Sequence, residues 1–159
     1  MKKVFALILT LALALSLSAT AFAAQLEQDS VPSAADAEIT TSIAPTYTVT
    51  IPANVTVAFC DTETAFGTIE VVASQIHPDK CIKVALTTDG ALNNAIDDTK
   101  VIPYVIKDAE GKAFTSATYL TEGDKTELSI HITAEDWNAA YAGSYSDTVT
   151  FTITYEDKV

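Results

Sequence analysis

Residues 145–155 restrict the fold more than any other part of the chain, because large apolar side chains and threonines alternate there with a period of two. This alternation is typical of a β-strand that buries one face, and it does not fit the 3.6-residue period of an amphipathic helix. The apolar set of this closing strand is Tyr145, Val149, Phe151, Ile153 and Tyr155. We therefore predict that this set faces a core and that Thr148, Thr150, Thr152 and Thr154 face outward.

Shorter segments repeat the same rhythm and are separated by turns rich in glycine and aspartate. The further strands that we predict cover residues 46–51, 55–60, 67–73, 81–88, 101–107 and 126–133. Pro52 has no N–H for a ladder hydrogen bond, so we expect it to interrupt the first strand at a sheet edge. The only helical signal is a capping pattern at 133–136, enough for one turn. An all-β antiparallel sandwich is the predicted fold.

The first 23 residues have the pattern of an export signal. Lys2 and Lys3 precede an apolar run over residues 4–17, and Ala21-Phe22-Ala23 supplies a cleavage motif. We predict a signal peptide at 1–23, with an uncleaved membrane anchor as the alternative, and a secreted or cell-surface location. No second apolar segment follows, so no transmembrane segment is expected after cleavage.

Residues 24–45 mix small, acidic and proline residues with few large apolar ones, and they predict a flexible leader before a sandwich domain at 46–159.

The charge of the chain limits the classes of partner that are expected. Its net charge is −12 and it contains no arginine. Because phosphate recognition depends on cationic side chains, nucleic acid and anionic membranes are not expected as partners.

The chain shows no recognisable catalytic centre. No nucleophile-elbow motif is present, and His77 and His131 stand apart without a metal-ligand spacing. Adjacent acids such as Asp97 and Asp98 do not form the separated carboxylate pair of a glycosidase, although calcium binding by acidic turns remains an alternative. We predict that the protein is not an enzyme and has no catalytic residue, no cofactor and no metal.

Two pairs of residues invite a structural or a binding interpretation. Cys60 and Cys81 are an even number of cysteines in an exported chain, which predicts one disulfide, with a metal site or a reactive thiol as the alternatives. Trp137 and Tyr141 are candidates for stacking on a sugar ring. The favoured interpretation is that Trp137 plugs the end of the sandwich, because large aromatic side chains usually bury most of their surface.

Residues 142–155, from Ala142-Gly143 to Tyr155, resemble the closing strand of chaperone–usher pilin-like domains, especially the spore coat protein U group of secreted fimbrial subunits. Residues 46–57 resemble the first strand of that group. Cys60, then Phe66-Gly67-Thr68, then Cys81 follow its order of cysteine, F-G-T and cysteine.

The resemblance implies an immunoglobulin-like sandwich with a Cys60–Cys81 disulfide, in which Gly143 and the apolar set of the closing strand serve core packing and assembly. It also implies that an N-terminal extension of one subunit completes the sheet of the next, with other copies or other surface subunits as partners. We therefore expect a non-catalytic structural or adhesive surface subunit of fimbrial type. The alternative is a secreted carbohydrate-binding module that contacts glycans through Trp137 and Tyr141.

Overall fold

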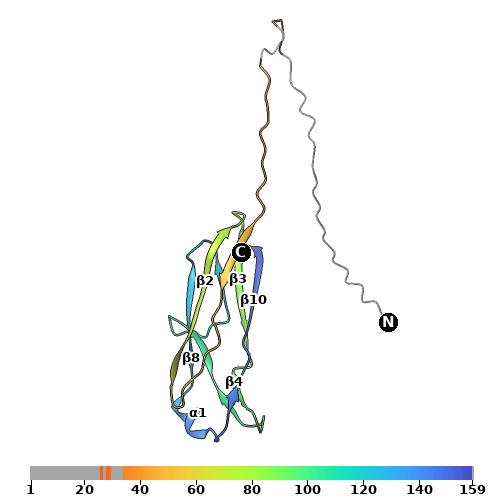
Figure 1. Ribbon diagram of the computed structural model, residues 1–159. Helices are drawn as coiled ribbons and strands as arrows, with labels where there is room; N and C mark the ends of the chain where they lie inside the picture. The colour runs from red at the N-terminus through yellow and green to blue at the C-terminus, as the bar shows by residue number, and fades with distance from the viewer. Residues whose placement is uncertain (1–25, 27, 30–33, 159) are drawn as a thin grey trace, which may run out of the picture. The chain divides into compact units, whose positions relative to one another are not determined.

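The computed structural model describes residues 26, 28–29 and 34–158, and it divides the chain into two units, Met1–Ser42 and Ile43–Val159. The predicted signal peptide at 1–23 lies outside the described residues. Residues 34–42 form neither helix nor strand, and their side chains are exposed. The second unit contains every strand described (Figure 1).

The second unit has ten strands and one short helix among its described residues. They are β1 (Thr46–Thr50), β2 (Glu63–Gln75), β3 (Lys80–Thr87), β4 (Ala91–Asn94), β5 (Val101–Pro103), β6 (Val105–Asp108), β7 (Ser116–Tyr119), β8 (Lys125–His131), α1 (Ala134–Ala139), β9 (Tyr145–Ser146) and β10 (Thr150–Asp157). The helix begins where the sequence predicts, because the Thr133 side chain accepts a hydrogen bond of 3.1 Å from the Asp136 N–H.

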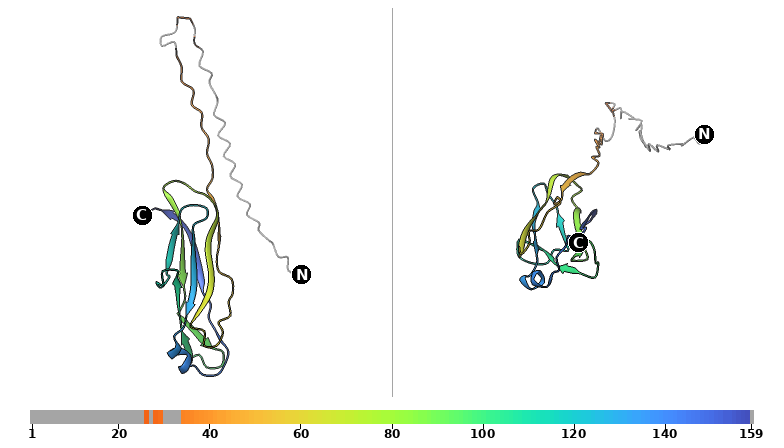
Figure 2. Two further views of the ribbon diagram at one scale, coloured as in Figure 1. Left: turned by 90° about the vertical axis from the view of Figure 1, so that its left-hand side faces the viewer. Right: turned by 60° about the horizontal axis from the view of Figure 1, so that its bottom comes forward.

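All strand pairs are antiparallel, and they form sheets with the orders β1-β2-β8-β6, β10-β3-β7 and β5-β4-β9. The strands run along one common axis of the unit (Figure 2). One core lies between the sheets, since Ile69 of β2, Ile82 of β3 and Ile102 of β5 belong to a single buried cluster. The predicted all-β antiparallel sandwich is confirmed.

Residues 55–60 do not form the predicted strand. Regular pairing of β1 with β2 ends at Thr50, and residues 51–62 belong to no strand. Pro52 lies against the backbone of Gly67, where a β-carbon would come within 3.1 Å of the proline ring. A β-bulge in β2 between Ala65 and Gly67 shifts the register nearby. The proline and the bulge together end the ladder on this side of β2.

The closing strand is shorter and less buried than its pattern predicts. The segment divides into β9 and β10, because the Asp147 side chain accepts a 2.6 Å hydrogen bond from the Thr148 N–H and interrupts the ladder. The alternation itself is confirmed, since Val149 and Phe151 pack against the core. The predicted burial of Ile153 is not confirmed. Its side chain is 36% exposed, because β10 is the border strand of its sheet.

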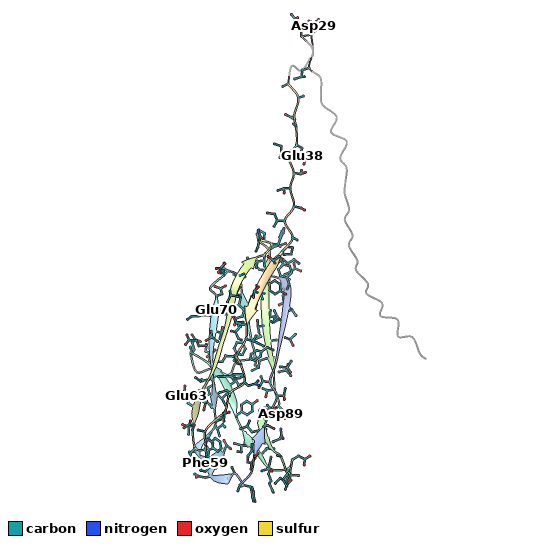
Figure 3. All side chains as sticks on the ribbon, in the orientation of Figure 1. Asp29, Glu38, Phe59, Glu63, Glu70 and Asp89 are labelled. Atoms are coloured by element: carbon teal, nitrogen blue, oxygen red, sulfur yellow. The ribbon has the colours of Figure 1, made fainter. Side chains whose placement is uncertain are left out.

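The predicted Cys60–Cys81 disulfide is wrong for this fold, in which both cysteines are free. Cys60 precedes β2, whereas Cys81 lies at the start of β3 beyond the other end of β2. Thirteen residues of β2 separate the two ends by about 40 Å, and a disulfide needs α-carbons within about 7 Å. Phe59, next to Cys60, marks the α1 end of the unit in Figure 3. The sequence order of the cysteines did not reveal the length of the strand between them.

Candidate functional site: an open sheet edge

Strand β10 has a strand partner on only one side. It pairs with β3 along its full length, from Thr150 opposite Thr87 to Asp157 opposite Lys80. No strand among the described residues pairs with its other edge. A border strand of eight residues that bears large apolar side chains is a template for a further strand.

The border strand of the neighbouring sheet is open as well. Among the described strands β1 pairs only with β2, and the chain then continues through residues 51–62 without joining a sheet. The side chains of Ile51 and Val55 are 44% and 38% exposed there. The two borders approach each other at one end, where the rings of Tyr47 and Tyr155 lie 6.0 Å apart.

We use the term open edge for the exposed or half-buried apolar side chains along these borders. It comprises Tyr47, Val49, Ile51, Val55 and Val57 on one side and Val149, Phe151, Ile153 and Tyr155 on the other. Phe151 also contacts Phe66 of β2, with ring centroids 6.0 Å apart. The open edge is therefore continuous with the core and differs from scattered surface residues.

The remaining residues predicted for the closing strand make contacts at its beginning and at its far end. Gly143 lies against the buried Asn94, whose side-chain nitrogen would come within 2.4 Å of a β-carbon at this position. The hydroxyl of Tyr145 donates a hydrogen bond of 2.9 Å to the carbonyl oxygen of Tyr141. At the far end of β10 the hydroxyl of Tyr155 accepts a 3.0 Å hydrogen bond from the His77 N–H.

A hydroxyl–carboxylate cluster fixes the chain just before β10, and the sequence did not reveal it. The hydroxyls of Tyr104 and Thr88 both donate to Oδ2 of Asp147, the second over 2.9 Å, and they lie 2.6 Å from each other. Burial, reinforced by the bond to Asp147, raises the pKa of Tyr104 to about 12. The three groups come from distant strands and loops, so no local spacing could have predicted their contact.

This cluster makes stability depend on pH. Burial alone would raise the pKa of Asp147, but the hydrogen bonds from Tyr104, Thr88 and the Thr148 N–H outweigh burial and lower it. A lowered pKa in the folded state contributes stability above the unfolded value of about 3.9, and that stability is lost as the pH falls through the folded value.

We expect Asp147→Asn to lower the free energy of unfolding at pH 7 and to change it much less near pH 2. Urea unfolding at both pH values measures this, with Glu110→Gln on the exposed β6–β7 turn as the charge control. An equal difference at both pH values would contradict the assignment.

The two aromatic candidates for glycan contact have different surroundings. Trp137 is 9% exposed, its Nε1 donates 2.8 Å to the carbonyl of Asp61, and Phe59 contacts its ring edge-on at 5.6 Å. Trp137 is therefore mostly buried, as the end-plug interpretation expects. Tyr141 is exposed, but the ammonium of Lys100 lies over its ring at 4.9 Å. The two rings therefore do not form a shared sugar platform.

Within the described part of the chain, no three His, Cys, Asp or Glu side chains are grouped so that they could hold a metal ion. None of the helices described there is long and apolar enough to span a bilayer.

No protein-family model and no curated protein matches the chain. One similar solved chain comes from work titled "Chaperone-tip adhesin complex is vital for synergistic activation of CFA/I fimbriae biogenesis", with a TM-score of 0.44 and 12% sequence identity. The similarity covers 68% of this chain and 42% of that one, so this chain spans less than half of its length.

Proposed function

We propose that this protein is a non-catalytic structural or adhesive subunit of an extracellular or cell-surface assembly, and that copies join when a strand of one is added to the open edge of another. The observation that supports the proposal is that β10 has the sequence of a core strand but the exposure of a border strand. Its sequence alternates as strictly as a core strand, yet Ile153 is more than a third exposed and no strand of the described residues pairs with the outer edge of β10. An added strand would bury these side chains and complete the backbone hydrogen bonds.

The leader offers a strand of matching character. From residue 35 to residue 43, every second side chain is alanine, isoleucine or threonine, and the positions between them are polar or acidic. The apolar face consists of Ala35, Ala37, Ile39, Thr41 and Ile43. Residues 34–43 would extend about 33 Å as a strand, enough to cover the roughly 26 Å of β10. Ile39 is 97% exposed, so it is available to a second copy.

A peptide tests the proposal directly. We expect a synthetic peptide of residues 34–44 to bind the isolated monomer and raise its melting temperature, because ligands of the folded state stabilise it. At a concentration of about 100 Kd the gain is roughly 2.7 kcal/mol, or about 10 °C for a unit of this size. Differential scanning calorimetry measures the shift.

The matched controls use the two faces of the peptide. A peptide with Ile39→Asp and Ile43→Asp loses the apolar face and should have no effect. A peptide with Thr40→Asp and Ser42→Asp changes only the opposite face and should stabilise the monomer nearly as well. If millimolar parent peptide leaves the melting temperature unchanged, assembly by strand addition from the leader is ruled out.

A further inference from the structure

The loop between β4 and β5 presents one isoleucine on a rigid support. Ile96 is 92% exposed, the largest exposed fraction of any large apolar side chain described in the second unit. The side-chain oxygen of Asn94 accepts hydrogen bonds from the N–H groups of Ile96 and Asp97, over 2.9 and 3.3 Å. The Lys100 N–H donates 3.0 Å to the carbonyl of Asp97 and closes the turn. A loop ordered in advance loses little entropy when it binds, which suits Ile96 for a specific contact.

A mostly apolar hollow that could receive an isoleucine side chain lies at the opposite end of the unit. It has a volume of about 450 Å³, and its lining includes Ile43, Pro45, Ile76, Pro78, Lys80 and Tyr155. Strand β3 begins beside the hollow at Lys80 and ends near the β4 loop at Thr87. In Figure 1 the turn between β2 and β3 and helix α1 mark these two ends, and Asp89 in Figure 3 lies toward the α1 end.

The charges at the two ends are complementary. Asp98 lies beside Ile96, is exposed, and has no cation within ion-pair distance among the described residues. At the rim of the hollow, the ammonium of Lys158 donates 2.7 Å to the carbonyl of Pro78 and pairs with no carboxylate of the described chain. A chain with a net charge of −12 gains from placing an unpaired acid against an unpaired lysine.

The direction of strand addition brings these two ends together. β10 runs from the α1 end at Thr150 to the hollow end at Asp157. Every strand pair described in this unit is antiparallel, so we take the leader to add antiparallel to β10. It then runs toward the α1 end, and its last residue, Ile43, emerges there. Ile43 and Pro45 line the donor's own hollow, so this hollow meets the loop of the acceptor that bears Ile96.

We propose that Ile96 of one copy fills the hollow beside Tyr155 of the next copy, with Asp98 against Lys158, so that subunits stack head to tail. The proposal rests on strand addition from the leader and specifies its direction. Such a contact joins two different surfaces and does not close on itself, so it produces filaments.

Cysteine cross-linking tests the contact. In a Cys60→Ser background, the pair Asp98→Cys and Lys158→Cys should form intermolecular disulfides on mild oxidation and give a ladder of multiples on a non-reducing gel. The control pair, Asp98→Cys with Lys112→Cys, places the second thiol on the exposed β6–β7 turn, away from both ends. We expect at least roughly tenfold more ladder from the first pair, because a disulfide requires close α-carbons.

A second variant measures the apolar part of the contact. Ile96→Asp should weaken end-to-end association by roughly tenfold, as for a central apolar interface residue. Ala109→Asp adds the same charge on the exposed β6–β7 turn, away from both ends, and should leave association unchanged.

The outcomes separate the two proposals. A ladder no stronger than the control, with the 34–44 peptide still raising the melting temperature, overturns the head-to-tail contact and leaves strand addition standing. A strong ladder with no effect of the peptide supports the contact and overturns strand addition. Absence of both effects overturns both proposals.

Discussion

Ile153→Asp is expected to weaken the proposed assembly by strand addition strongly while leaving the monomer folded. The side chain of Ile153 is partly exposed in the monomer, so an aspartate there can remain hydrated. An added strand would cover this position and bury an unpaired charge, which costs several kcal/mol. We expect the association constant to fall on the order of 100- to 1000-fold, measured by analytical ultracentrifugation.

The control for this change is Thr152→Asp. Thr152 neighbours Ile153 in β10 but faces away from the core, and its side chain is exposed. The Thr152→Asp variant adds the same charge to the same strand and should alter the association constant by less than about threefold. Equal losses from both variants would mean that net charge, and not the open edge, governs assembly.

Trp137→Ala is expected to lower the free energy of unfolding by about 3–5 kcal/mol, the usual range for deletion of a buried aromatic side chain. The change removes the edge-on contact with Phe59 and the hydrogen bond to the carbonyl of Asp61. Both partners lie in the segment 51–62, which no strand holds in place, so the loss should also loosen this segment. Urea unfolding gives the free energy, and hydrogen exchange reports on the segment.

Tyr141→Ala provides the comparison. Tyr141 is 63% exposed, and its ring contacts only the ammonium of Lys100 among the aromatic and cation contacts described. We expect a cost below about 1 kcal/mol, as for most exposed positions. A similar cost for both variants would contradict the role of Trp137 as the end plug.

The sequence predicted those features that depend on neighbours along the chain. Alternation placed Phe151 and Thr152 on opposite faces of β10, and the Thr133 cap marked the start of α1. Local pattern also placed an interruption of the first strand at Pro52, two residues after β1 ends at Thr50. Such features follow from the two-residue period of a strand and from capping chemistry, both of which act over a few residues.

Features that depend on distant pairing were missed. The pattern over residues 55–60 matched a strand, but no neighbouring strand is available to pair with it. Ile153 fits a core position, yet only the order of strands in the sheet shows that β10 is a border strand. The contact of Asp147 with Tyr104 joins residues 43 apart in sequence. Sheet order and long-range contacts decide which core-like residues remain uncovered, and alternation alone does not contain this information.

The two free thiols at opposite ends of β2 imply that this unit folds without covalent closure. The exposed thiol of Cys60 and the buried one of Cys81 also differ in accessibility, which permits a probe to be attached at a single end of the native protein.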